Sequence, residues 1–183
     1  DQIAAPLPEG LATARSMCGF LYAGADIGGF GQDTTEDLML RWLALGIFVP
    51  LLRNHCTFGA RRQEFYLFEN KKAIKNLLDL RYSLIPYLYS EYVKSALRGE
   101  LLYTPLGFLY PNDERAKEIE DQLFVGGSIM IAPVYRQNEK GRLVYLPESM
   151  KNEQVRHYYK ILKKKQGSLI VKRVFDIVAS LVM

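Results

Sequence analysis

Two clusters of polar side chains stand directly after short apolar runs in the first third of the chain. Asp26 follows one run, and Arg53, Asn54 and His55 follow the next. Carboxylate, guanidinium, amide and imidazole groups donate or accept hydrogen bonds, so together they can bind a polar ligand. Where strands run parallel, their carboxyl ends carry the functional side chains. The two clusters therefore indicate one candidate site, provided that the apolar runs are neighbouring parallel strands.

The elements predicted around these clusters form a strand–helix–strand unit. Residues 17–23 are apolar and are followed by a glycine, which is typical of a buried parallel strand. A helix is expected to begin near residues 33–35, where acidic and hydroxyl side chains resemble a helix cap, and to end before Pro50. The apolar residues 47–52 predict the second strand. This order places both polar clusters at the carboxyl ends of strands.

The rest of the chain changes from a helical to a strand-like period near residue 127. Residues 70–98 predict a long helix, in which Pro86 is expected to cause a kink or a break. Residues 114–123 predict a short helix. Residues 128–134 and 142–146 predict the two strands of a hairpin. A β-rich segment is therefore expected after the α/β part.

Charge and cysteine content argue against two classes of protein. The net charge is +4, but eight Lys or Arg residues and two acidic residues lie from Lys151 onward, which leaves 16 basic and 18 acidic residues before it. The basic excess belongs to the tail, so we expect no nucleic-acid partner. Cys18 and Cys56 form neither a disulfide framework nor a zinc motif. Such sparse cysteine predicts a reducing, cytoplasmic location.

Plainer interpretations of the same residues stand beside the site hypothesis. Taken alone, Asp26 fits a helix cap or a structural acid, and His55 fits a hydrogen-bonded core histidine. Cys56 is not expected to form a nucleophilic dyad with its neighbour, because adjacent residues of an extended segment point apart. The Gly28–Gly31 loop lacks the spacing of a phosphate-binding loop. Trp42, at helical spacing, is expected in the core.

A series of motifs within residues 11–150 resembles glycoside hydrolase family 31, an α-glucosidase-type family. The motifs, in chain order, are Gly24-Ala25-Asp26-Ile27-Gly28-Gly29-Phe30, Arg41-Trp42, Arg53-Asn54-His55, Gln63-Glu64-Phe65, Arg81-Tyr82-Ser83-Leu84-Ile85-Pro86-Tyr87-Leu88-Tyr89, Gly127-Ser128-Ile129-Met130-Ile131-Ala132-Pro133-Val134 and Val144-Tyr145-Leu146-Pro147. Any one of them is weak, but the set in this order is specific.

The resemblance implies an α/β fold, with the C-terminal portion of a (β/α)8 barrel followed by β-strands of a β-sandwich domain. We expect the barrel portion in residues 1–125, the start of the C-terminal β-domain in residues 126–150, and a divergent basic and apolar tail in residues 151–183. Residues 104–108 and Gly127 depart from the family's pattern. These departures bear on packing and substrate choice and leave the resemblance intact.

The family hydrolyses α-glycosidic bonds with retention, using one aspartate as nucleophile and another as acid and base. Both belong to motifs upstream of the family's Gly-Ala-Asp motif, and neither motif occurs in this chain. The resemblance therefore implies a fragment of a retaining α-glycosidase in which no residue is catalytic. We expect it to be inactive alone, and neither a metal nor an organic cofactor is implied.

By position, Asp26 and His55 match family residues that hydrogen-bond sugar hydroxyls. Carboxylate and imidazole suit this role, because a sugar presents paired hydroxyls that need fixed acceptors and donors. Arg53 is expected to orient carboxylates by charge-assisted hydrogen bonds, and Phe30 and Trp42 to support or line the pocket. The resemblance thus implies an α-glucoside or oligosaccharide substrate, bound through Asp26, His55, Arg53 and Phe30.

Two alternatives belong to other classes of protein. One is a carbohydrate-binding or structural remnant, whose incomplete barrel leaves strand edges uncovered and needs a complementary chain to fold. The other rests on residues 158–183, in which Lys172–Val178 resembles the membrane-associating helix of bacterial sugar transferases. It makes the chain a membrane-associated phosphosugar transferase fragment. A membrane is expected to contact the chain only through this tail.

The tail hypothesis predicts that the full chain co-sediments with liposomes that contain anionic lipid, because its lysines and apolar residues favour such a surface. Deleting residues 158–183 should abolish co-sedimentation. Binding that survives the deletion would contradict the hypothesis.

Overall fold

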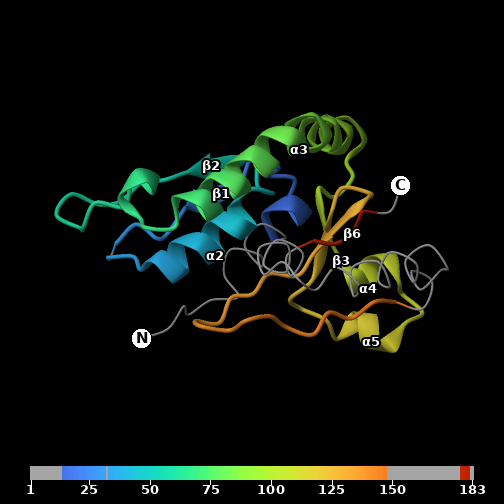
Figure 1. Cartoon of the computed structure of the whole chain (residues 1–183). Helices are drawn as coiled ribbons and strands as arrows, with labels where there is room; N and C mark the ends of the chain where they lie inside the picture. Colours follow the sequence, from blue (N-terminus) through green and yellow to red (C-terminus); the bar gives the residue numbers. More distant parts are fainter. Residues whose placement is uncertain (1–13, 32, 148–177, 182–183) are drawn as a thin grey trace. The chain divides into compact units, whose positions relative to one another are not determined.

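The structure is a computed structural model, and it describes residues 14–31, 33–147 and 178–181. The chain forms two compact units (Figure 1). The first comprises Asp1–Leu102 with Tyr135–Asn138, and the second comprises Tyr103–Val134 with Glu139–Met183. Predictions for residues 148–177, including all but the last residue of the segment that resembles sugar transferases, lie outside the described residues; that last residue, Val178, is in a strand. In the described part of the chain, no helix is both long enough and apolar enough to span a membrane.

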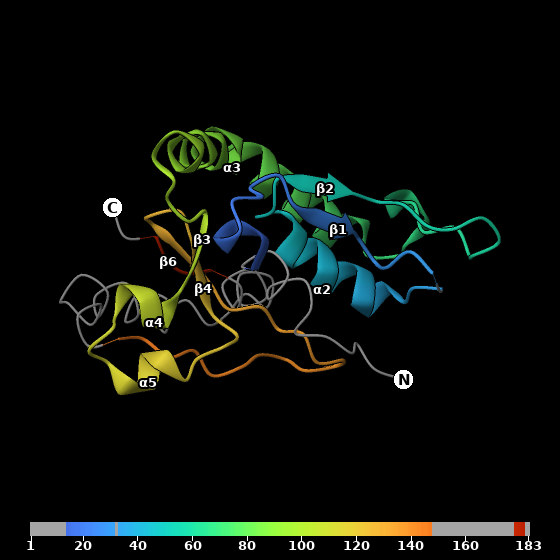
Figure 2. The ribbon, with the colours of Figure 1, turned by 180° about the vertical axis from the view of Figure 1, so that it is seen from behind.

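The first unit contains the predicted strand–helix–strand arrangement. Strand β1 (Gly24–Asp26) and strand β2 (Leu51–Arg53) pair in parallel, and helix α2 (Glu36–Gly46) connects them. Helices α2 and α3 lie beside the strand pair in both Figure 1 and Figure 2. The register sets Asp26 opposite Arg53. The expectation that the two polar clusters follow neighbouring parallel strands is therefore confirmed.

Both strands are shorter than the apolar runs that predicted them. Residues 14–17 are helical, and a turn follows in which Gly19 has φ 80°, so the strand begins only at Gly24. After α2, Phe48 N–H and Val49 N–H donate to carbonyls three residues back, which continues the helix as a tight turn. The apolar side chains of Ile47 and Phe48 fill the core, at 0% and 1% exposed, without forming a strand.

Helix α2 begins where its capping residues predicted and packs closely on β1. Thr35 is the N-cap and accepts a hydrogen bond from Leu38 N–H at 3.2 Å. At the other end, a Cβ atom on Gly46 would lie 2.4 Å from Ile27 Cδ1. Ile27, directly after β1, is fully buried. The absence of a side chain at Gly46 thus lets the strand lie against the helix.

Helix α3 (Lys71–Arg98) runs through Pro86 without a break. Its start is fixed by two acceptors, because Asn70 caps it and the Glu36 carboxylate accepts from the backbone N–H groups of residues 69 and 70 at 3.0 and 2.9 Å. Near its middle, the Arg81 guanidinium donates to two backbone carbonyls that follow α2, at 2.7 and 3.1 Å. These contacts on the N-terminal side of Pro86 hold the helix while the proline omits one hydrogen bond.

The second unit is built on a four-stranded antiparallel sheet. Its order is β3 (Tyr103–Pro105), β4 (Leu123–Val125), β5 (Ile129–Ile131) and β6 (Val178–Leu181), each strand beside the next. Strands β4 and β5 are buried at every residue. The antiparallel pairing agrees with the expected β-sandwich strands, and β3 and β4 lie within residues 1–125, where the barrel portion was expected.

Two short helices connect β3 to β4. They are α4 (Leu106–Leu109) and α5 (Glu114–Lys117), and Leu106 and Ala116 pack with Phe124 in a small core. The prediction of a helix over residues 114–123 was therefore too long. Its last residue, Leu123, already belongs to strand β4, which the sequence pattern missed.

The predicted hairpin is correct for one strand and wrong for its partner. Strand β5 lies within residues 128–134, but it pairs with β4 and not with residues 142–146, which form no strand. Instead, the buried Gln122 side chain donates to Tyr145 O at 2.8 Å and accepts from Tyr145 N–H at 2.7 Å. One side chain thus satisfies the backbone groups that a neighbouring strand would otherwise have paired.

The close pairing of β1 and β2 predicts that Gly24→Ala is strongly destabilising. A Cβ atom at Gly24 would lie 2.1 Å from Leu51 O, a backbone atom that cannot rotate away. We expect a loss of at least about 2 kcal/mol in urea unfolding followed by circular dichroism, as for overpacked sites. Gly31→Ala is the control, because nothing lies within 4 Å of its Cβ position. Equal unfolding midpoints for the two variants would contradict the described register.

Candidate functional site

The carboxyl ends of β1 and β2 bring Asp26 and Arg53 into contact. Arg53 Nε donates to Asp26 Oδ1 at 2.6 Å. The Asp26 side chain is 16% exposed and that of Arg53 is 55% exposed, so the pair lies at a surface and adds little to stability. Its effect is to orient the carboxylate at the edge of the sheet.

The charge of Arg53 is fixed at ordinary pH. The hydrogen bond to the Asp26 carboxylate raises the pKa of Arg53 above its usual value, desolvation opposes that shift, and the Coulomb attraction of Asp26 adds to it. An arginine with a raised pKa cannot lose its proton under physiological conditions. Arg53 therefore acts as a permanent cation that orients its neighbour, and it cannot serve as an acid or a base.

The loop after β1 turns sharply because two glycines take a left-handed conformation. Gly28 and Gly29 have φ of 90° and 91°, and Gly29 N–H donates to Asp26 O at 2.9 Å. A Cβ atom at Gly29 would be 3.6 Å from the Trp42 ring, so the half-buried Trp42 lies against this turn. Trp42 thus supports the loop that carries Phe30.

Phe30 and His55 meet across the two loops. Their ring centroids are 5.4 Å apart with an interplanar angle of 38°. Phe30 is half exposed and His55 is exposed, so the plain interpretation of His55 as a core residue does not hold. Thr57 N–H donates to Phe30 O at 2.8 Å, which joins the backbones of the two loops. The structure therefore gathers the four predicted site residues into two contacting pairs.

Gln63 belongs to one of the motifs but was not predicted as a site residue, and it lies buried beneath these pairs at 2% exposed. Its Nε2 donates to the carbonyls of Ile27, Gly29 and His55 at 3.3, 3.1 and 3.1 Å. In return, Asn54 Nδ2 donates to Gln63 O at 2.7 Å. The only signal in the sequence was the Gln-Glu-Phe motif, which gives no indication of which backbone groups the amide meets.

The segment between His55 and Gln63 is joined to the start of α2. Arg61 N–H donates to Asp33 Oδ1 at 2.5 Å, and the Arg61 guanidinium donates to Thr34 O. These contacts hold the exposed loop against the segment that precedes α2. Among the described residues there is no group of three or more His, Cys, Asp or Glu side chains that could hold a metal ion.

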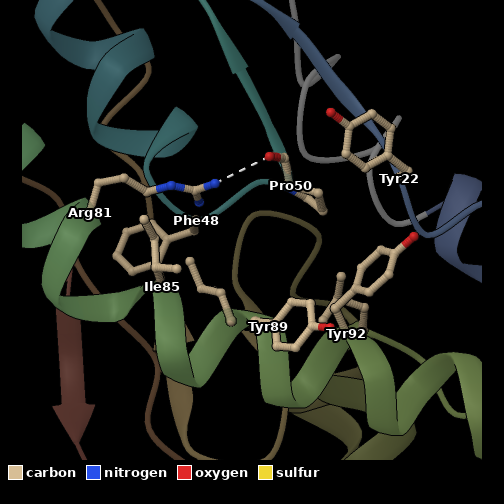
Figure 3. Close-up of a pocket in the computed structure, with 9 residues that line it drawn as sticks. Tyr22, Phe48, Pro50, Arg81, Ile85, Tyr89 and Tyr92 are labelled. Carbon is tan, nitrogen blue, oxygen red and sulfur yellow. Dashed lines mark hydrogen bonds between the residues drawn. The ribbon is translucent and has the colours of Figure 1, made fainter.

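An apolar cavity of about 270 Å³ lies at the opposite ends of the strands (Figure 3). Tyr22 precedes β1, and Phe48 and Pro50 precede β2, whereas the site residues follow the strands. The cavity is lined by Tyr22, Phe48, Pro50, Arg81, Ile85, Leu88, Tyr89, Tyr92 and Leu102. Arg81 already donates to Pro50 O at 3.1 Å, the dashed line in Figure 3. The cavity is therefore distinct from the candidate site, which lies where functional groups of parallel α/β folds are found.

Comparison with known protein families gives two matches along this chain. The TIM-barrel domain of glycosyl hydrolases family 31 matches residues 1–91, and the C-terminal domain of the same family matches residues 99–177. The second match includes much of the segment predicted to be a divergent tail. The division of the chain at residues 125 and 150 stays a prediction.

Curated relatives include α-glucosidases. Alpha-glucosidase 2 of Bacillus thermoamyloliquefaciens is 37% identical over 148 residues, which are 76% of this chain and 19% of the relative. Lysosomal alpha-glucosidase of Bos taurus is 34% identical over 150 residues, which are 81% of this chain and 16% of the relative. The chain thus spans about a fifth or less of the length of these proteins.

Solved structures agree with the sequence matches. The Tris-bound glucosidase II alpha subunit superposes with a TM-score of 0.74 at 33% identity, covering 78% of this chain and 16% of that one. The Flavobacterium johnsoniae GH31 dextranase complexed with glucose superposes with a TM-score of 0.69 at 29% identity, covering 76% and 18%. Two domain matches, curated relatives and solved structures all agree that this chain belongs to glycosyl hydrolase family 31.

Proposed function

We propose that this chain contributes part of the glucose-binding subsite of a retaining, α-glucosidase-type glycoside hydrolase. The observation that carries the proposal is the Asp26–Arg53 pair at the carboxyl ends of two parallel strands, with the Phe30–His55 pair beside it. The names of the relatives support the substrate class, because they include α-glucosidases and a dextranase solved with glucose.

The chemistry of the four side chains suits a sugar. A carboxylate held by arginine presents its other oxygen to a pair of hydroxyl groups. The imidazole of His55 can donate or accept a hydrogen bond, and the exposed Phe30 ring offers an apolar surface beside it. Polar groups at fixed positions next to an aromatic face are what a small, specific ligand site requires.

These residues bind and orient, and they do not by themselves cleave a glycosidic bond. Retaining hydrolysis needs two carboxyl groups about 5–5.5 Å apart, one as nucleophile and one as acid and base. Asp26 already accepts a hydrogen bond from Arg53 Nε at 2.6 Å, so its carboxylate is held in place by a cation and is not half of a carboxyl pair. The roles of nucleophile and acid are therefore assigned to the family motifs that this sequence lacks.

A second candidate is a carbohydrate-binding or structural unit that needs another chain to complete its barrel. Within the described residues, β1 and β2 form a sheet of only two strands, which leaves both outer edges without a strand partner there. One solved relative is an ER glucosidase II heterodimer of a catalytic subunit with the binding domain of a regulatory subunit. For this chain, any such partner is a proposal.

The proposed function makes a prediction about turnover. The purified chain should release no product from an aryl α-glucoside above the uncatalysed rate, because a single oriented carboxylate cannot carry out double displacement. The assay is continuous colour release at neutral pH, with any residual rate compared between the wild-type chain and Asp26→Asn. Turnover that disappears in Asp26→Asn would show that Asp26 is catalytic and would overturn the assignment.

The proposed function also makes a prediction about sugar binding. Titration of the chain with methyl α-D-glucopyranoside, followed by ligand-observed NMR, should detect weak binding. Asp26→Asn should weaken it by about tenfold or more, because a hydrogen bond to a charged group is lost. His55→Ala should also weaken it.

Asp79→Asn is the matched control, since Asp79 is an exposed aspartate of α3 that pairs only locally with Lys75. Equal affinities for Asp26→Asn and Asp79→Asn would exclude Asp26 from the subsite. Absence of binding by the wild-type chain would favour the structural alternative.

A further inference from the structure

Gln63 lies between the two loops that carry the proposed subsite. Asp26 ends β1, the loop after it holds Phe30, and the loop after β2 holds His55. The Gln63 amide nitrogen donates to Ile27 O and Gly29 O in the first loop and to His55 O in the second, at 3.3, 3.1 and 3.1 Å. A single buried side chain thus connects the backbones next to three of the four predicted site residues.

The identity of the neighbouring atoms fixes the orientation of this amide. All three neighbours of its nitrogen are carbonyl oxygens, which can only accept, so the NH2 group and not the oxygen must face them. The backbone of Gln63 is held as well, because Asn54 Nδ2 donates to Gln63 O at 2.7 Å. Side chain and main chain therefore fix Gln63 relative to both loops.

The oxygen end of the Gln63 amide lowers the stability of the fold. Gln63 Oε1 is buried and has no hydrogen-bond partner among the residues that the structure describes. An unpaired buried acceptor destabilises a fold, and a methionine of similar length would avoid that penalty. A side chain selected only to fill the space would therefore be apolar, and the donor end of the amide is what the site requires.

We propose that Gln63 is a positioning residue that sets the separation of the two loops, and hence the placement of His55 relative to Phe30 and Asp26. This inference rests on the proposed function only for the identity of the ligand. Gln63 acts through the backbone carbonyls of its neighbours and does not itself touch the sugar. Without its two N–H groups, three carbonyls would face a buried space with no donor, and the loops would separate.

The Phe30–His55 ring contact provides a direct readout of loop spacing. His55 and His157 are the only histidines, so His157→Gln leaves a single imidazole to observe by NMR in the full chain. Phe30 lies 5.4 Å from His55 between ring centroids, so its ring current should shift the His55 proton resonances. Phe30→Leu in the same background gives the reference value without that ring.

Two substitutions and one matched control test the proposal. Gln63→Met keeps the length and removes the donor, and Gln63→Glu keeps the shape and presents an acceptor to the three carbonyls. Gln122→Met is the control, because Gln122 is also 2% exposed and hydrogen-bonds backbone groups, but in the second unit. If the effect came from the loss of any buried glutamine, both Gln63→Met and Gln122→Met would shift the His55 resonances. If Gln63 positions the loops, only the Gln63 variants should shift them.

We expect the His55 resonances of Gln63→Met and Gln63→Glu to move to the Phe30→Leu value, while Gln122→Met leaves them at the wild-type position. Affinity for methyl α-D-glucopyranoside should fall tenfold or more in Gln63→Met and stay unchanged in Gln122→Met. An unchanged His55 shift in folded Gln63→Met would overturn the proposal.

If Gln63→Met does not fold, the wild-type chain still decides the question. The two Gln63 amide protons should exchange slowly with solvent and show scalar coupling to the carbonyl carbons of Gly29 and His55. Rapid exchange without such coupling would overturn the proposal. If the wild-type chain binds no glucoside but the His55 shift depends on Gln63, the proposed function fails and the positioning role stands.

Discussion

The parallel register of β1 and β2 is the constraint on which the first unit depends. Each strand has only three residues, yet their pairing sets Asp26 opposite Arg53 and starts both loops at the same edge. The ladder continues one step further, since Ile27 N–H donates to Arg53 O at 2.8 Å. A shift of one residue would turn the Asp26 side chain to the other face of the sheet, so the site exists only in this register.

The close approach that this register needs comes from residues without side chains. Gly24 allows the strands to meet, and Gly46 allows Ile27 to pack on α2. Gly28 and Gly29 then reverse the chain with positive φ, which side chains disfavour. Glycine at two places allows close contact and at two others allows the chain to turn. Together these four glycines set the positions of the polar groups.

The sequence predicted the order of elements and the grouping of polar residues better than it predicted extents and contacts. Asp26 and Arg53 could be assigned to neighbouring strand ends because parallel α/β folds place such ends together. The strand lengths could not be predicted, because buried strands and buried turns both contain apolar residues such as Ile47 and Phe48. Likewise Gln63 is an ordinary glutamine in the sequence, and only the tertiary fold shows which three carbonyls meet its amide.

Pairs of identical residues show how context separates binding from structure. Arg53 donates to a carboxylate at an exposed edge, whereas Arg81 donates to the backbone carbonyls of Ile47 and Pro50 at the opposite strand ends. Arg81 satisfies groups that the end of α2 leaves unpaired, so its removal weakens the fold. Within the described residues, the Arg53 side chain donates to Asp26 and to no backbone group, so it can be retained for what Asp26 binds.

The same contrast holds for the two buried glutamines. Gln122 uses both amide atoms on Tyr145, with a further contact from Nε2 to Met130 Sδ at 3.8 Å, and thereby replaces a missing strand partner. Gln63 uses only its donor end, and it uses it on two separate loops. Full satisfaction is what stability alone selects. An amide with only its donor end hydrogen-bonded is tolerated between two loops where the relative position of those loops matters more than the cost of one unpaired acceptor. The Gln63 amide is therefore better explained by the site above it than by the core around it.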